Sequence, residues 1–284
     1  PLTKPLTRIE KMYQALVLGL KDYVAKNNFK KVILGLSGGI DSALSLAIAV
    51  DALGAEHVEA ILLPSRFTAD ISNEDAVAEA EALKVNYQSI NIEECYQSFL
   101  NTLEKNFTQT RADLTEQNIQ ARCRAIILMA LSNKFGSLVL TTSNKSEIAV
   151  GYSTLYGDMA GGFCVLKDVL KTDVYRLAVY RNSISPVIPK RVIERAPSAE
   201  LAENQRDQDS LPPYEILDEI IKLYVEQDQD DAAIIARGFD VDTVNEVIRK
   251  IKLNEYKRRQ APLGVRLNER AFGKDRRYPI SSGY

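Results

Sequence analysis

Histidine and cysteine are scarce in this sequence of 284 residues, which contains one histidine and three cysteines. Because His57 is the sole histidine, neither a Ser-His-Asp triad nor a histidine-based metal site is expected. We expect a structural role for His57. Cys95, Cys123 and Cys164 are widely spaced and form no CxxC pair, so neither a zinc ribbon nor a dithiol redox site is expected. A sparse, odd cysteine count suits the reducing cytosol, which predicts a cytoplasmic protein.

Long hydrophobic runs and an excess of positive charge are also lacking. The apolar runs are far shorter than the roughly 20 residues of a membrane-spanning helix, so no membrane segment is expected. The formal net charge is −2, which gives no indication of a nucleic-acid partner. With 45% hydrophobic residues, the chain is long enough for one large domain with a substantial core, and residues 1–284 are treated as that domain.

Apolar patterns of two kinds alternate along the first half of the chain. Short apolar runs, typical of buried strands, alternate with segments of helical period. The strand-like runs are 31–36, 58–63, 86–92 and 138–142, and the helix-like segments are 9–26, 43–53, 72–84, 93–105 and 115–135. This order predicts an α/β fold, a doubly wound parallel sheet with helices on both faces. Ligands of such sheets bind beyond the carboxyl ends of the strands.

The pattern changes after residue 150. Four glycines between 151 and 162 predict a flexible loop, and residues 183–213 hold five prolines and many charges without a clear period. A stretch of that length inside a domain is usually a lid or disordered. Residues 214–226 and 241–259 again have a helical period, so a helical C-terminal part is expected.

The segment from Gly35 to Ser42, GLSGGIDS, is the most informative motif. It follows a predicted strand and precedes a predicted helix, so its glycines let the backbone approach an anion at the positive end of that helix. The hydroxyls of Ser37 and Ser42 add donors, and the carboxylate of Asp41 suits Mg²⁺. The motif is neither GxxxxGK[ST] nor GxGxxG, which argues against a P-loop NTPase and against NAD bound as a hydride carrier. It resembles the SGGxDS signature of the PP-loop ATP pyrophosphatases.

Several later segments resemble one family of that superfamily, the NAD synthetases. Residues 118–124 (NIQARCR) are similar to their N-[IV]-x-A-R-x-R segment, and residues 141–147 (TTSNKSE) are similar to a second signature. Residues 156–158 (YGD) and 257–262 (KRRQAP) follow in the family's order. The resemblance extends from about residue 9 to 280 and implies an adenine nucleotide alpha-hydrolase-like fold.

The resemblance also implies roles for individual residues. The residues expected to bind ATP are Gly35, Leu36, Ser37, Gly38, Gly39, Ile40, Asp41, Ser42, Thr142, Lys171 and Ser198. Those expected to bind deamido-NAD, whose diphosphate calls for cations, are Asn118, Arg122, Glu147, Lys257 and Arg258. Asp41 and Glu147 would hold Mg²⁺, and Asp41 and Lys171 would take part directly in catalysis.

The implied reaction is the ATP-dependent amidation of deamido-NAD by ammonia, through an acyl adenylate, with release of AMP and pyrophosphate. The family suggests a homodimer in which Arg122 comes from the partner subunit. The chain departs from ammonia-only members, because Leu155 stands where they carry a lysine, and Gly161 and Gly162 occupy a stretch where an aspartate is usual. The segment GYSTLYGDMAGGF instead looks like that of glutamine-dependent members. These carry a glutaminase domain, which is missing here, and the chain begins with Pro1, so a synthetase domain of a longer protein is expected.

Two alternatives remain open from the sequence. The first is another PP-loop amidotransferase, such as a GMP synthetase, which would differ in the acceptor. The second is a non-catalytic adenine-nucleotide-binding module, which would generally lack an acidic residue like Glu147 and a substrate segment like 118–124. A tRNA-thiolating enzyme is less consistent with the sequence, because neither a cysteine pair nor a basic nucleic-acid domain is found.

Overall fold

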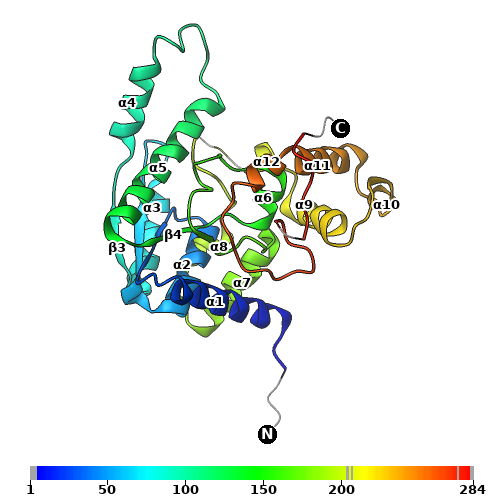
Figure 1. Ribbon diagram of the computed structural model, residues 1–284, viewed down its shortest axis with the longest axis horizontal. Coiled ribbons are helices and arrows are strands. Elements are labelled where there is room, and N and C mark those ends of the chain that lie inside the picture. Colours follow the sequence, from blue (N-terminus) through cyan, green and yellow to red (C-terminus); the bar gives the residue numbers. More distant parts are fainter. Residues whose placement is uncertain (1–4, 203–204, 206, 274, 282–284) are drawn as a thin grey trace.

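A parallel β-sheet forms the centre of the fold in the computed structural model, which describes residues 5–202, 205, 207–273 and 275–281 (Figure 1). Across these residues, five strands pair in the order β3-β2-β1-β4-β5, and every neighbouring pair is parallel. The strands are β1 (Val32–Gly35), β2 (Val58–Leu62), β3 (Asn86–Ser89), β4 (Leu138–Thr141) and β5 (Phe163–Cys164). The predicted doubly wound parallel sheet is confirmed.

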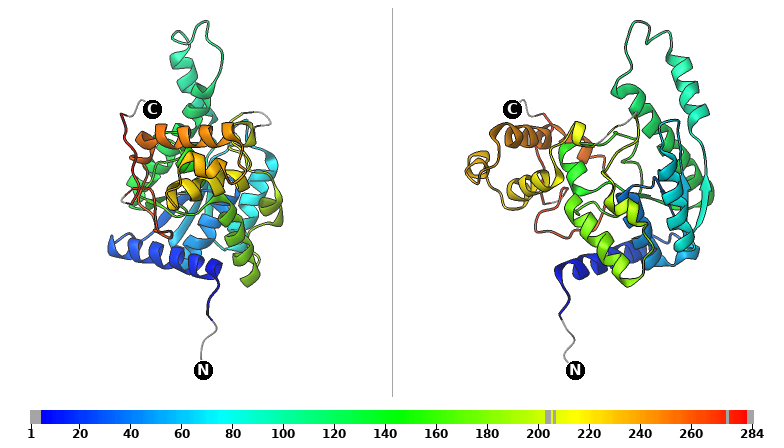
Figure 2. Two further views of the ribbon diagram at one scale, coloured as in Figure 1. Left: turned by 90° about the vertical axis from the view of Figure 1, so that its right-hand side faces the viewer. Right: turned by 180° about the vertical axis from the view of Figure 1, so that it is seen from behind.

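Helices cover both faces of the sheet, as the alternating pattern predicts (Figures 1 and 2). One face carries α1 (Arg8–Lys26), α2 (Ile40–Leu53), α3 (Asp70–Ala82) and α7 (Lys171–Ile184), which share the largest apolar cluster with the strands. The other face carries α4 (Glu93–Leu103) and α5 (Leu114–Phe135), which bury Tyr96 and Cys123 against Ile61. Because both faces are covered, the strands consist of apolar runs rather than an alternating pattern.

A second group of helices stands beside the sheet, on the right of Figure 1, around its own apolar cluster. It contains α6 (Lys145–Val150), α9 (Tyr214–Ile221), a π-helical turn (Lys222–Glu226), α10 (Asp231–Ile235), α11 (Val241–Leu253) and α12 (Glu255–Arg258). The helical C-terminal part is therefore confirmed. The remaining described elements are the short helix α8 (Lys190–Glu194) and the 3₁₀ turns Ala55–His57 and Asp207–Asp209.

Capping residues in the sequence fix where the long helices begin. Thr7 caps α1 and Asp113 caps α5, each in a capping box with the glutamate three residues later. Asn144 caps α6 in the same way, with Glu147 as the glutamate of its box. The cap of α6 therefore places Glu147 in the first turn after β4, at the carboxyl edge of the sheet.

Several boundaries differ from the sequence-based expectation. The expected loop between residues 151 and 162 leads into edge strand β5, which the short apolar pattern did not reveal. The stretch 183–213 is not structureless, because it contains the end of α7, all of α8 and a 3₁₀ turn. The helix expected over 241–259 is broken at Asn254, whose side-chain amide donates to the carbonyls of Val150 and Lys250. Among the described residues, no helix is long and apolar enough to cross a membrane.

Candidate active site

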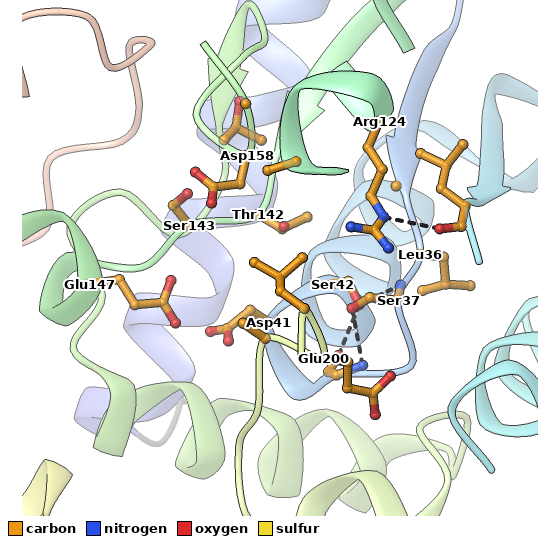
Figure 3. A pocket seen from close by; sticks show the side chains of 18 of the residues that line it. Leu36, Ser37, Asp41, Ser42, Arg124, Thr142, Ser143, Glu147, Asp158 and Glu200 are labelled. Atoms are coloured by element: carbon orange, nitrogen blue, oxygen red, sulfur yellow. Dashed lines mark hydrogen bonds between the residues drawn. The ribbon is translucent and has the colours of Figure 1, made fainter. Parts of the chain in front are cut away.

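A pocket opens at the carboxyl edge of the sheet, where the segments after β1, β2 and β4 converge (Figure 3). Residues 35–37 and 39–42 form one wall, and residues 141–143 with Glu147 form another. Segment 197–201 and Asp207 also line the pocket. Of the residues predicted to bind ATP, every one except Gly38 contributes to this lining. The structure thus brings together residues that are up to 172 positions apart in the sequence, from Gly35 to Asp207.

The loop at residues 37–42 has the geometry of an anion cradle. Gly38 has φ +76°, and a Cβ atom there would lie 2.2 Å from the carbonyl oxygen of Ser72, so only glycine fits. The hydroxyls of Ser37 and Ser42 lie 3.1 Å apart, and the Ser42 hydroxyl donates to the carbonyl of Gly39 at 2.9 Å. Helix α2 begins directly after Gly39 without a side-chain cap. Its first backbone N–H groups and its positive dipole end are therefore available to an anion in the pocket.

A buried lysine joins the two predicted metal ligands. Lys171 is 2% exposed, and its ammonium contacts the carboxylate of Asp41 and lies 3.1 Å from that of Glu147. Burial alone would lower the pKa of Lys171, but the two carboxylates outweigh it and hold its pKa above the ordinary value, so the side chain is charged. Burial raises the pKa of Glu147, against the opposing effect of Lys171. The amide of Asn144 fixes Asp41 by donating to it at 2.9 Å.

The charges around Lys171 fit an additional cation. Asp41 and Glu147 share one ammonium, and Asp207, 3% exposed, adds a third carboxyl group to the pocket. One carboxyl oxygen of Asp207 accepts from Tyr214 at 2.8 Å, while the other has no hydrogen-bond partner among the described residues. Within those residues, no three potential ligands gather closely enough to form a metal-binding group. Mg²⁺ binds in proteins through one or two carboxylates together with phosphate oxygens and water, and Asp41 and Glu147 present carboxyl groups of that kind in the pocket.

The other end of the pocket is apolar and contains a cation that the sequence analysis did not single out. Leu36, Ile61, Leu128 and Leu140 line this end, which suits the flat face of a purine base. Arg124 enters it from α5 and donates to the carbonyl of Leu63 at 3.0 Å (Figure 3). Desolvation lowers the pKa of Arg124. The only sequence signal for this residue was its place as the last arginine of the segment 118–124.

Three residues predicted to bind the dinucleotide meet around the loop at residues 151–158. The carboxamide oxygen of Asn118 accepts from Thr154 at 2.7 Å, and Arg122 donates to the carbonyl of Leu155 at 3.2 Å. Lys257 donates to the carbonyls at positions 151 and 153, at 2.7 and 2.8 Å. These residues lie outside the pocket lining itself, but the loop that they hold contributes Gly157 and Asp158 to it. Burial raises the pKa of Asp158 to about 6, although Thr154 donates its backbone N–H to the carboxylate.

Arg258 is not brought to the pocket. Its side chain is buried, 7% exposed, and its guanidinium donates to Glu255 at 3.0 Å and to the carbonyl of Ala149 at 2.7 Å. The rings of Phe272 and Tyr278 lie 4.8 and 5.5 Å from it. Because the guanidinium of Arg258 is surrounded by partners from the protein itself, these contacts favour a structural role. The predicted contact of Arg258 with deamido-NAD stays a prediction.

Comparisons with known proteins identify relatives over most of the chain. The model of the NAD synthase family matches residues 12–261. The glutamine-dependent NAD(+) synthetase of Xanthomonas campestris is 57% identical over 96% of this chain, which covers 50% of that protein. The chain therefore spans about half the length of the curated relatives that it matches.

Solved structures give the same result. A glutamine-dependent NAD+ synthetase from Acinetobacter baumannii, in complex with adenosine diphosphate, is 52% identical, with a TM-score of 0.69 over 100% of this chain and 52% of that one. The NMN synthetase from Francisella tularensis is 28% identical, with a TM-score of 0.71 over 88% of this chain and 98% of that one.

Proposed function

The chain belongs to the NAD synthase family, and on that basis we propose that it converts deamido-NAD to NAD by ATP-dependent amidation. The observation that carries the proposal is the pocket in which the anion cradle, a buried lysine and two carboxylates converge. The relative solved with adenosine diphosphate supports an adenine nucleotide as the occupant of this pocket. The sequence left open a GMP synthetase and a non-catalytic module, and membership of the NAD synthase family argues against both.

The first step activates the carboxylate of deamido-NAD. A carboxylate oxygen attacks the α-phosphorus of ATP, the bond from that phosphorus to the bridging oxygen breaks, and pyrophosphate leaves. The loop at 37–42 would hold the departing phosphates through its N–H groups and the hydroxyls of Ser37 and Ser42. Lys171 would stabilise the negative charge that develops on them. Alignment of the two substrates alone can contribute roughly 7–11 kcal/mol to lowering the barrier.

We place Mg²⁺ at Asp41 and Glu147, where oxygen ligands surround one shared ammonium. When bound, the ion would neutralise phosphate charge and polarise the phosphorus–oxygen bonds. The carboxylates themselves keep Lys171 charged, and Asn144 keeps Asp41 oriented toward the pocket.

In the second step ammonia attacks the acyl carbon, the bond from that carbon to the AMP oxygen breaks, and NAD and AMP are released. The nucleophile loses a proton in this step. Asp158 lines the pocket, and its carboxyl group is the candidate to accept that proton or hold an ammonium ion. No protein nucleophile is required.

The nitrogen donor and the assembly belong to the whole protein. Because the relatives are named as glutamine-dependent and are about twice as long, we propose that a glutaminase domain of the full-length protein supplies ammonia. A homodimer is proposed as well. It is supported by exposed apolar side chains one turn apart on α5, Ile126 (58% exposed) and Met129 (38% exposed), on the helix that also carries Arg122.

The test follows oxygen rather than product alone. Deamido-NAD labelled with ¹⁸O in its carboxylate is incubated with the chain, Mg-ATP and ammonia, and AMP is analysed by mass spectrometry. Transfer of one ¹⁸O atom to AMP is expected, because the carboxylate oxygen that attacks phosphorus stays with it. Unlabelled AMP, with NAD formed, would reject the acyl adenylate.

The same assay also settles the acceptor. Because an NMN synthetase shares the fold at 28% identity, the mononucleotide counterpart of deamido-NAD is tested in parallel. A higher kcat/KM for the mononucleotide would assign the chain the smaller substrate.

A further inference from the structure

A segment of eight residues, Arg195 to Ala202, crosses one side of the pocket; we refer to residues 195–202 as the strap. It follows α8 directly, since Arg195 is the residue that ends that helix. Five of its residues, 197–201, line the pocket. The contacts at the two ends of the strap reach two different parts of the site.

At its first end, the strap contacts the anion cradle. The guanidinium of Arg195 donates to the carbonyl oxygen of Gly38 at 3.1 Å and to the hydroxyl of Ser72 at 2.9 Å. The hydroxyl of Ser72 in turn donates to Glu200 at 2.5 Å, and Glu200 lies 3.7 Å from Arg195. Arg195 therefore fixes the backbone of the one loop residue, Gly38, whose positive φ shapes the cradle.

Backbone conformation within the strap supports this arrangement. Glu200 has φ +49°, in the left-handed region that non-glycine residues seldom adopt. Its backbone N–H donates to the hydroxyl of Ser198 at 3.1 Å. Such a conformation persists where surrounding contacts over-determine it, and here the Glu200 carboxylate, drawn in Figure 3, accepts from Ser72 and lies 3.7 Å from Arg195.

At its other end, the strap contacts the helix that carries Asn118 and Arg122. The carbonyl oxygen of Leu201 accepts from the side-chain amide of Gln120 on α5 at 3.0 Å. Gln120 is 1% exposed and is also fixed by the hydroxyl of Ser65, which donates to it at 3.2 Å. The position of Leu201 is therefore tied to the same helical turn that holds the proposed dinucleotide-binding residues.

From these contacts we infer that Arg195 is a positioning residue that, through the strap and Gln120, makes the binding of ATP and of deamido-NAD mutually reinforcing. The inference rests on the proposed function for the identity of the two ligands. A phosphate tail that orders the cradle also orders Gly38 and hence Arg195. Arg195 and Glu200 then hold the strap in the position at which Leu201 meets Gln120. By linkage, each ligand then binds more tightly when the other is present.

The test measures coupling between two binding events in the 284-residue chain. The dissociation constant of α,β-methylene-ATP with Mg²⁺ is determined by calorimetry, alone and with saturating deamido-NAD. In the wild type, deamido-NAD should tighten the analogue about fivefold or more, the lower range of measured allosteric couplings. In Arg195→Gln this factor should fall below about twofold. Gln120→Ala, which releases the other end of the strap, should give the same loss.

Arg191→Gln is the matched control. Arg191 lies one turn earlier on α8, and its side chain pairs with Asp75 at 2.9 Å and Glu74 at 3.0 Å on α3; among the described residues, that side chain forms its hydrogen bonds and ion pairs with α3 rather than with the cradle or the strap. It should retain the wild-type coupling. Arg195→Lys keeps the charge but cannot donate to Gly38 and Ser72 with the geometry of a guanidinium, so its coupling factor should be intermediate. This variant keeps the test valid if Arg195→Gln does not fold.

Three results would overturn the inference. They are equal affinity for the analogue with and without deamido-NAD in the wild type, full coupling in Arg195→Gln, or loss of coupling in Arg191→Gln. NAD formation by the wild type is measured beside them. A chain that makes NAD without coupling overturns this inference alone, whereas a chain that makes no NAD overturns the proposed function.

Discussion

Two buried clusters in this chain each hold a cationic side chain, but in different surroundings. In the first, Lys171 lies between Asp41 and Glu147, and all three residues line an open pocket, where Figure 3 shows the two carboxyl groups. In the second, Arg258 lies between Glu255, two backbone carbonyls and two aromatic rings. The first cluster has capacity for a ligand, whereas the second is complete within the protein.

The difference shows what burial of a charge does and does not indicate. A buried ion pair contributes little net stability, yet removal of one partner is costly because it leaves the other uncompensated. Such a cluster indicates function only where its charges do not balance. Around Lys171 the carboxyl groups of Asp41, Glu147 and Asp207 outnumber the one ammonium, which is such an imbalance.

Asp41→Asn should have the largest effect and tests the first cluster. Loss of this carboxylate removes a proposed Mg²⁺ ligand and one partner of Lys171, so kcat should fall about 1,000-fold. The thermal unfolding midpoint should change little, because Lys171 keeps Glu147 as a partner. Steady-state kinetics and calorimetric unfolding check both parts. A variant with near wild-type kcat would remove the functional half of the comparison.

Arg258→Met tests the second cluster and should act in the opposite way. Removal of the guanidinium takes one partner from Glu255, which is 2% exposed, and one donor from each of two carbonyls. The free energy of unfolding should therefore fall by about 3 kcal/mol. The KM for deamido-NAD should stay unchanged in protein that remains folded. Denaturant unfolding and kinetics at low temperature give the two values. If KM rises tenfold while stability is kept, the sequence-based assignment to the substrate site is restored.

Lys257→Met sharpens the comparison, because the residue is adjacent in sequence to Arg258 but is placed differently. Lys257 holds the carbonyls at 151 and 153 of the loop that reaches the pocket. The KM for deamido-NAD should rise about tenfold, equivalent to about 1.4 kcal/mol, with kcat little changed. Equal losses in kcat and in the affinity for ATP would show that the loop as a whole had been displaced.

Glu79→Gln concerns a third kind of buried charge, one without a hydrogen-bond partner among the described residues. Burial raises the pKa of Glu79 well above its ordinary value, against the lowering effect of Arg181. The contribution of Glu79 to stability is therefore greatest below about pH 4.5, the pKa of a glutamate in the unfolded chain. It is lost as the pH rises through the pKa of Glu79 in the folded protein. The glutamine variant should be more stable than the wild type by about 1 kcal/mol at pH 8 and should gain less at pH 4. Unfolding at both pH values tests this; an equal change at the two would contradict it.

The sequence predicts the sheet and the cradle well because both depend on local patterns. Apolar runs mark the strands, and the segment GLSGGIDS combines glycines, hydroxyls and a helix start within eight residues. Helix α7 was missed because it buries Lys171, Asp173 and Arg181, which interrupt its apolar pattern. The role of Arg258 could not be inferred from the sequence, since its partners at Ala149 and Phe272 are brought to it only by the tertiary fold.

The fate of the phosphates of ATP tests the central claim most directly. With deamido-NAD, ammonia and Mg-ATP labelled separately at the α- and γ-phosphates, the account predicts that all α-label appears in AMP and all γ-label in pyrophosphate. Both products should form in a one-to-one ratio with NAD. Label recovered as ADP and orthophosphate would contradict it, because the cradle would then serve the transfer of a terminal phosphate rather than of AMP.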